Sequence, residues 1–210
     1  MSLAVFVLMW VGYAQNWAWL DRIDTSILRP LHAYGQAHPG WVMAWNVFCT
    51  VLGPTAFRLI ALVVIIVALT RRNLRLALFL VISVELSGLV TEAVKTTANR
   101  PRPAEAMVNA ASSSFPSGHA VGVMVGVLAL LTVAWPVVDA RYRPWLAALG
   151  GVVIVAIGVG RVVLNVHHPS DVVAGWALGY AWFVACVLLV PPAVPITAPD
   201  ETPATPGSSR

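Results

Sequence analysis

Charge is scarce in this sequence. Charged residues make up 10% of its 210 residues, and apolar residues make up 59%. Ordinary soluble domains carry about 25% charged and about 45–50% apolar residues. So few charges cannot coat a water-exposed surface, which excludes a soluble monomer, and the high hydrophobicity excludes intrinsic disorder over most of the chain. The composition predicts an all-α protein that crosses a membrane several times.

Cysteine and lysine are scarcer still. The two cysteines, Cys49 and Cys186, lie far apart in apolar sequence, without the spacing of a metal site. We expect both to be small buried hydrophobes. Lys95 is the only lysine. The sequence has no arginine-rich run with interleaved aromatic residues, so the net charge of +4 is better explained by cationic loops that orient a membrane protein than by nucleic-acid binding.

Six apolar stretches predict six membrane-spanning helices, since each crossing of a ~30 Å hydrocarbon core needs about 20 residues. The first stretch is short and could pass for a signal peptide, but it lacks a basic n-region, so we expect a short first span. Residues 30–57 carry Trp41 and Trp45 among Pro, Gly and His residues, which indicates a helix lying at the membrane interface. The predicted spans are residues 1–15, 54–70, 76–94, 120–138, 145–160 and 172–190.

The loops between these spans predict the orientation. Six spans place both termini on one side, together with the loops near Arg71 and Arg141, which hold five arginines and one acid. We expect this side to be the cytoplasmic side of the plasma membrane. Residues 1–190 form one predicted membrane domain, and the Pro-rich residues 191–210 form a predicted disordered cytoplasmic tail.

Three polar clusters fall on the opposite, extracytoplasmic side. Taken singly, each has an ordinary explanation: a snorkelling lysine with a basic loop, a helix cap, and an acid near a helix N-terminus. Taken together, they supply three cations, two helix N-termini and a His/Asp pair, which predicts a site for a tetrahedral oxyanion with acid–base or nucleophilic chemistry. The clusters are Lys95 with Arg102, then Ser117, Gly118 and His119, then Arg161, His167 and Asp171.

The order and spacing of these residues, K-x6-R-P, P-S-G-H and R-x5-H-x3-D, resemble the three-part signature of the type-2 phosphatidic acid phosphatase superfamily. The third family motif often begins Ser-Arg, whereas Gly160 precedes Arg161 here. Arg100 begins a second Arg-Pro pair, but only Arg102 has the family spacing from Lys95. The resemblance covers residues 95–171 and implies a six-helix membrane phosphatase with its active site at the extracytoplasmic surface.

The resemblance also implies a role for each matched residue. His167 would attack phosphorus and form a phosphohistidine, Asp171 would orient His167, and His119 would protonate the leaving oxygen. The phosphoryl oxygens would be held by Lys95, Arg102 and Arg161, with backbone N–H groups near Ser117 and Gly118. Because the motifs contain no cluster of acidic ligands, we expect no metal and no other cofactor.

The expected partner is a lipid substrate, since the site lies at the ends of membrane helices. By analogy with the family, a polyprenyl diphosphate is the first expectation, and phosphatidic acid or phosphatidylglycerol phosphate is the second. A transporter that binds a lipid phosphate without cleaving it stays open as a third reading. The sequence indicates no oligomeric state.

Two further residues need an interpretation. His168 adjoins His167, but the family spacing to Asp171 selects His167, so we expect His168 to have little chemical role. Glu85 lies inside a predicted span, where an acid is unusual. An acid within the membrane is by default a candidate functional residue, but Glu85 is left outside the predicted site, with two alternatives: a pair with Arg58, or a protonated acid between helices.

Overall fold

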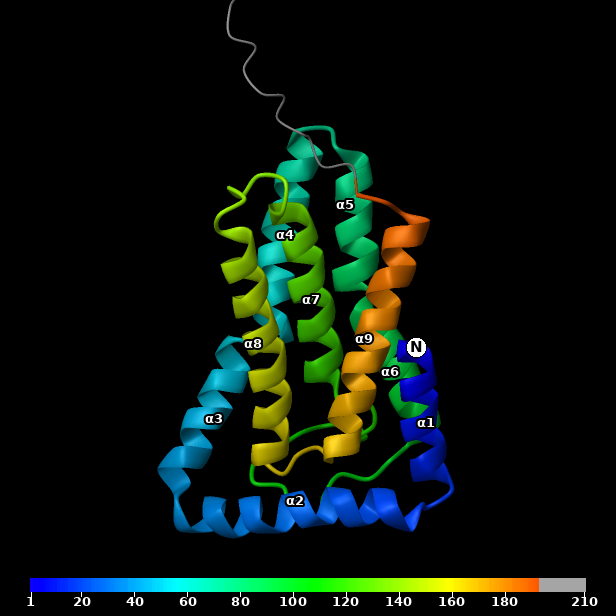
Figure 1. The fold of residues 1–210 in the computed structure, drawn as a ribbon, viewed down its shortest axis with the longest axis vertical. Helices are drawn as coiled ribbons and strands as arrows, with labels where there is room; N and C mark the ends of the chain where they lie inside the picture. The colour runs from blue at the N-terminus through cyan, green and yellow to red at the C-terminus, as the bar shows by residue number, and fades with distance from the viewer. Residues whose placement is uncertain (193–210) are drawn as a thin grey trace, which may run out of the picture.

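The apolar stretches form the upright helices of a bundle, and the polar segments connect them at its two ends (Figure 1). This computed structural model describes residues 1–192, so nearly all of the predicted disordered tail lies outside the described residues. The helices are α1 (Ser2–Ala14), α2 (Ala18–Ala37), α3 (Pro39–Val51), α4 (Pro54–Thr70), α5 (Leu74–Leu80), the π-helical turn η1 (Val81–Glu85), α6 (Ser87–Ala98), α7 (Gly118–Ala134), α8 (Arg143–Val163) and α9 (Pro169–Leu189).

The described part of the chain is a multi-pass membrane protein with four or five candidate spans. Four segments are long and apolar enough to cross a membrane: Pro39–Thr70, Leu74–Ala98, Arg143–Val163 and Pro169–Leu189. α1 and α2 qualify only as a pair, and they are bent by 93°. α7 is apolar but has only 17 residues. On these criteria the described residues fall short of the six predicted spans.

The predicted interfacial helix over residues 30–57 is wrong in its boundaries. The helix that runs across the base of the bundle is α2, which ends at Ala37 (Figure 1). α3 then continues through a short break at Leu52 and Gly53 into α4. Pro39 and Pro54 each stand at a helix start, where proline loses no intrahelical hydrogen bond, so the prolines begin helices rather than interrupt one.

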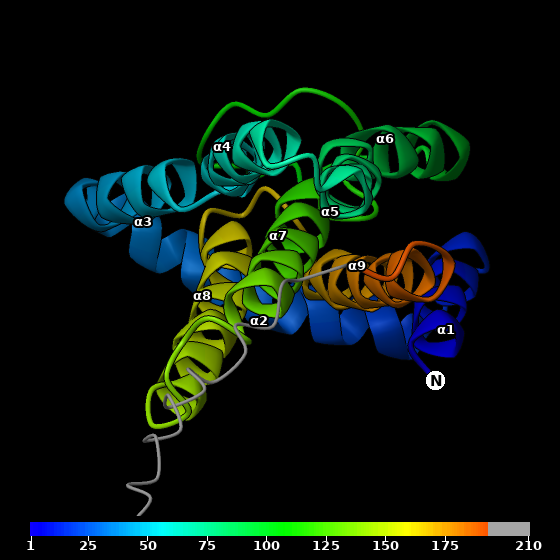
Figure 2. The ribbon, with the colours of Figure 1, turned by 90° about the horizontal axis from the view of Figure 1, so that it is seen from above.

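α7 lies at the centre of the bundle, packed against α4, α6, α8 and α9 (Figure 2). Glycines on α9 allow a close approach to α7. A Cβ atom added to Gly175 would lie 2.7 Å from Cβ of Ala120, and one added to Gly179 would lie 2.9 Å from the Val121 carbonyl oxygen. Small residues bring membrane helices together in this way. The contact sets the N-terminal part of α9 beside the first turn of α7, where the Ser117 N–H donates to the Asp171 carbonyl, and so joins the second and third sequence motifs.

The prediction for the two cysteines is confirmed, and the structure selects one of the alternatives for Glu85. Cys49 and Cys186 are buried and free. Glu85 pairs with Arg58, whose Nε atom lies 3.3 Å from Oε2 of Glu85. The pair with Arg58 is therefore the observed arrangement.

Candidate active site

The three sequence clusters converge at the end of the bundle that faces α2. One cavity of 510 Å³ is lined by Lys95, Arg102, Gly118, His119, Arg161 and His167. The other two predicted residues, Ser117 and Asp171, are fully buried and do not line it. One site is therefore built from distant parts of the chain: the end of α6 and the loop after it, the start of α7, and the end of α8 with the loop after it.

His167 lies in the loop between α8 and α9 and is 2% exposed. Its Nε2 atom lies 3.2 Å from Nη1 of Arg102, and its Nδ1 atom lies 3.7 Å from Oδ2 of Asp171. A guanidinium can only donate, so Nε2 accepts, and the ring proton of the neutral imidazole belongs on Nδ1, toward Asp171. Burial lowers the pKa of His167 to about 4, although Asp171 acts in the opposite direction. The Nε2 lone pair is therefore present at neutral pH.

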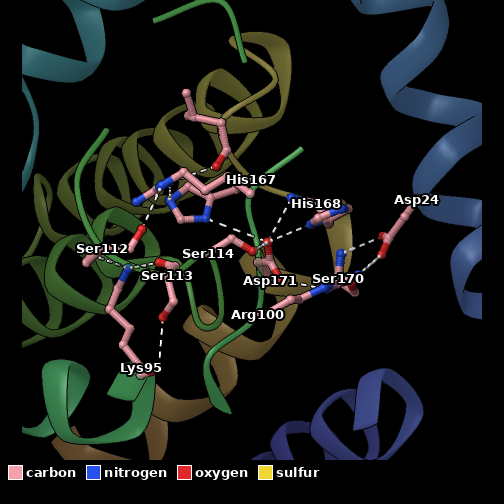
Figure 3. A network of polar contacts seen from close by, with 12 residues as sticks. Asp24, Lys95, Arg100, Ser112, Ser113, Ser114, His167, His168, Ser170 and Asp171 are labelled. Carbon is pink, nitrogen blue, oxygen red and sulfur yellow. Dashed lines mark hydrogen bonds and ion pairs between the residues drawn. The ribbon is translucent and has the colours of Figure 1, made fainter. Parts of the chain in front are cut away.

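Asp171, in the first turn of α9, is held on both carboxylate oxygens (Figure 3). Oδ1 accepts a hydrogen bond from Nη1 of Arg100 at 2.6 Å. Oδ2 accepts from the Ser114 hydroxyl and from the His168 backbone N–H, each at 2.8 Å. Nδ1 of His168 also lies 3.1 Å from Oδ2. His168 thus shares the carboxylate with His167, a contact that the sequence did not predict.

Arg102 is fixed by main-chain carbonyl oxygens. Its guanidinium donates to the carbonyl oxygens of Ala111, Ser112 and Val166 at 2.8, 3.0 and 2.7 Å. These bonds join the loop between α6 and α7 to the loop that carries His167. Arg102 therefore presents its charge beside His167 in a single orientation.

The other two cations lie close to the same cavity. Nζ of Lys95, at the end of α6, donates to the Ser112 hydroxyl at 3.2 Å and to the Ser113 carbonyl. Arg161, near the end of α8, is 7% exposed, and its Nε atom has no hydrogen-bond partner among the described residues. Three cations around one cavity favour an anion with several oxygens, because each charge-assisted hydrogen bond is strengthened by partial burial.

The second motif contributes the start of α7. Ser117 is the N-cap residue, but its backbone N–H donates to the Asp171 carbonyl at 3.0 Å. That N–H is therefore engaged, and the free donors of this helix end begin with Gly118 and His119. The His119 ring faces the break between α3 and α4, since a Cβ atom added to Gly53 would lie 3.3 Å from its Nε2 atom.

The sequence did not predict Asp24 and Arg100 as part of the site. Asp24, on α2, is 1% exposed. Its Oδ2 atom lies 2.9 Å from Nη2 of Arg100, and its Oδ1 atom accepts the Ser170 backbone N–H at 2.9 Å. The second Arg-Pro pair was a usable signal for Arg100. Nothing local marked Asp24, because its partners lie more than 70 residues away in the sequence.

With this geometry in view, comparison with known proteins identifies the family. Residues 76–195, more than half of the chain, match the PAP2 superfamily. The chain therefore belongs to this superfamily, as the resemblance of its three motifs indicates. A crystal structure described as a transmembrane PAP2 type phosphatidylglycerolphosphate phosphatase from Bacillus subtilis has the same fold, with a TM-score of 0.74 at 22% identity over 90% of this chain and 94% of that one.

Curated relatives are similar over shorter stretches. Phosphatidylglycerophosphatase B of Bacillus subtilis is 33% identical over 98 residues, which cover 45% of this chain and 48% of that protein. A lipid A 1-phosphatase of Rhizobium johnstonii is 34% identical over 125 residues, covering 53% and 46%. An undecaprenyl-diphosphatase of Sulfolobus acidocaldarius is 39% identical over 66 residues, covering 31% and 28%. The matched regions span less than half the length of each of these relatives.

Proposed function

We propose that this protein is a membrane lipid phosphatase that hydrolyses the phosphate or diphosphate headgroup of a lipid. One observation carries the proposal: Nε2 of His167 faces a cavity that three cations also line, while Nδ1 faces the buried carboxylate of Asp171. A site that only binds a lipid phosphate would need the cations but not an oriented imidazole. Membership of the PAP2 superfamily supports the same conclusion.

The reaction proceeds in two steps. In the first, the Nε2 lone pair of His167 forms a bond to phosphorus as the bond to the leaving oxygen breaks, and His119 gives that oxygen its proton. In the second, water attacks phosphorus, His119 takes up a water proton, and the N–P bond breaks to release phosphate. Asp171 stabilises the positive charge that His167 carries in between. Lys95, Arg102 and Arg161 hold the phosphoryl oxygens, with donors from the start of α7.

The chain crosses the plasma membrane six times in this proposal. The crossings are α1, then α3 and α4 together as one span, α5 and α6 together as another, and finally α7, α8 and α9. α1 is the weakest of them, because 13 residues reach only about 20 Å. The active site and α2 then face outside, and the arginines near Arg71 and Arg141 face the cytoplasm, together with both termini.

The substrate that we rank first is a polyprenyl diphosphate, cleaved to the monophosphate. Phosphatidylglycerol phosphate and phosphatidic acid are second. The relatives named as an undecaprenyl-diphosphatase and as phosphatidylglycerophosphatase B support these two classes. A lipid carries its phosphate to the membrane surface, where the cavity lies at the ends of the helices.

A substrate panel tests the proposal. The detergent-solubilised protein is supplied with a C55-type diphosphate, phosphatidylglycerol phosphate, phosphatidic acid and a water-soluble phosphate ester, and phosphate release is measured. We expect release from at least one lipid, inhibition by vanadate, and no turnover by the His167→Ala variant. EDTA should leave the activity intact. Lipid phosphate binding without release would favour the transporter, and loss in EDTA with recovery in Mg²⁺ would contradict the metal-free mechanism.

A further inference from the structure

We propose that Asp24, on the helix across the base of the bundle, is a positioning residue for the phosphatase reaction. Through Arg100 it sets the orientation and the net charge of the carboxylate behind His167. This inference rests on the proposed function, because it assigns Asp24 a role in the same site. Asp24 lies far from the three sequence motifs, so no part of the family signature contains it.

Asp24 contacts Arg100, which pairs with Asp171, and Ser170, which precedes Asp171 in the sequence (Figure 3). Oδ2 of Asp24 lies 2.9 Å from Nη2 of Arg100, and Nη1 of the same guanidinium lies 2.6 Å from Oδ1 of Asp171. The guanidinium therefore bridges two carboxylates that come from α2 and α9. Asp24 also accepts the backbone N–H and the hydroxyl of Ser170, the residue that precedes Asp171. It acts as a helix cap supplied by another helix, and it holds the first turn of α9 in place.

The charges of this cluster explain why an acid is needed at position 24. One guanidinium between two buried carboxylates leaves the group of Asp24, Arg100 and Asp171 with one net negative charge. Without the Asp24 charge, Arg100 would neutralise Asp171 alone, and the cluster would offer His167 less stabilisation when the ring becomes cationic. Removing Arg100 instead would leave two buried carboxylates without the cation that lies between them, which favours protonation of one of them.

The burial of the cluster argues against a simple tether between helices. Asp24, Arg100 and Asp171 are at most 7% exposed. Burying charges has a desolvation cost that can exceed the gain from pairing them, and apolar side chains often fasten helices equally well. The ion pairs from Asp24 through Arg100 to Asp171 are better explained by a second role: they orient the Asp171 carboxylate and set the charge beside His167.

The experiment compares four variants with the wild type in the phosphate-release assay, using the lipid that the wild type cleaves best. Asp24→Asn keeps the shape and the acceptor for the Ser170 N–H but removes the charge. Arg100→Gln removes the bridge, and the double variant Asp24→Asn/Arg100→Gln restores a single negative charge on Asp171. Asp21→Asn is the matched control, since Asp21 is an exposed acid on the same helix. Vanadate binding and the unfolding temperature in detergent are measured for each.

We expect kcat of Asp24→Asn to fall about 10- to 100-fold, the loss typical when a residue that orients an active-site side chain is removed. KM and the affinity for vanadate should stay within about threefold of the wild type. The double variant should be faster than either single variant, because its net charge is restored. Asp21→Asn should match the wild type.

Three results would overturn the inference. In the first, kcat of Asp24→Asn stays within twofold of the wild type. In the second, the unfolding temperature, vanadate binding and turnover of Asp24→Asn all decrease together, and the double variant is no better. That result would make Asp24 a structural tether only. In the third, the wild type releases phosphate from no substrate; this result would overturn the proposed function as well, whereas the first two leave that function intact.

Discussion

Nδ1 of His167 lies 3.7 Å from Oδ2 of Asp171, just beyond hydrogen-bonding distance. The same oxygen already accepts bonds from Ser114 and His168. Catalytic hydrogen bonds are often long before substrate binds and tighten in the transition state. We interpret this carboxylate as one held ready for a positive charge that develops on His167 during the reaction.

The first prediction concerns the charge of Asp171. Asp171→Asn keeps the size of the side chain but removes the negative charge behind His167. We expect kcat to fall about a thousandfold or more, as in other enzymes where an acid orients a catalytic histidine. Phosphate release under single-turnover conditions measures the chemical step directly. A loss smaller than tenfold would show that His167 does not depend on this carboxylate.

The second prediction separates the two adjacent histidines. His167→Ala should abolish turnover, because it removes the nitrogen that we propose as the nucleophile. His168→Ala should keep much of the activity, because Ser114, Arg100 and the backbone N–H of residue 168 still hold Asp171. The pair of variants is compared by phosphate release and by trapping of the phosphoenzyme. The reverse pattern would move the nucleophile to His168.

The third prediction concerns the protonation of His167. Burial lowers its pKa to about 4, so the ring is neutral from about pH 5 upward and gains its proton only in stronger acid. Asp171 raises this pKa, so Asp171→Asn should shift the titration to still lower pH. NMR of protein with labelled histidines measures the midpoint, and the His167→Gln variant assigns the signal. A midpoint at or above about 6.5, the value of a free histidine, would contradict the prediction.

The fourth prediction uses the tight contact at Gly53. A Cβ atom there would lie 2.4 Å from the Cys49 carbonyl oxygen and 3.3 Å from Nε2 of His119. Gly53→Ala should therefore displace the break between α3 and α4 and push on His119. We expect kcat to fall at least about tenfold and stability to drop by about 1–3 kcal/mol, as overpacking usually does. Gly40→Ala is the control, since nothing lies within 4 Å of a Cβ atom at that position. Equal activity of the two variants would show that the contact at Gly53 is unimportant.

Much of the fold could be predicted from hydropathy alone. The predicted span over residues 54–70 coincides with α4. The next predicted span overlaps the segment from α5 to α6, and the last three overlap α7, α8 and α9, with shifts of a few residues at their ends. Hydropathy could not predict the sharp bend after α1. It also could not show that Trp41 and Trp45 lie on a helix that continues toward α4, because prolines that begin helices resemble prolines that break them.

The convergence of the site was predictable for a different reason. Lys95, His119, Arg161 and His167 each lie near a helix end, and alternating spans bring those ends to one side of a membrane. Asp24 was beyond prediction, because its burial depends on a guanidinium 76 residues away in the sequence. An acid three residues after another acid has the local pattern of a solvated turn until its partner is known.

The carbonyl oxygens that hold Arg102 have one more consequence. A long, flexible side chain loses about 2 kcal/mol of rotamer entropy when it is fixed in one position. Arg102 is already fixed by Ala111, Ser112 and Val166, so this loss occurs during folding rather than when a phosphate arrives. Binding of a phosphate headgroup should therefore cost little additional side-chain entropy at Arg102. Binding of a small oxyanion should accordingly show a smaller entropic penalty than a surface arginine would impose.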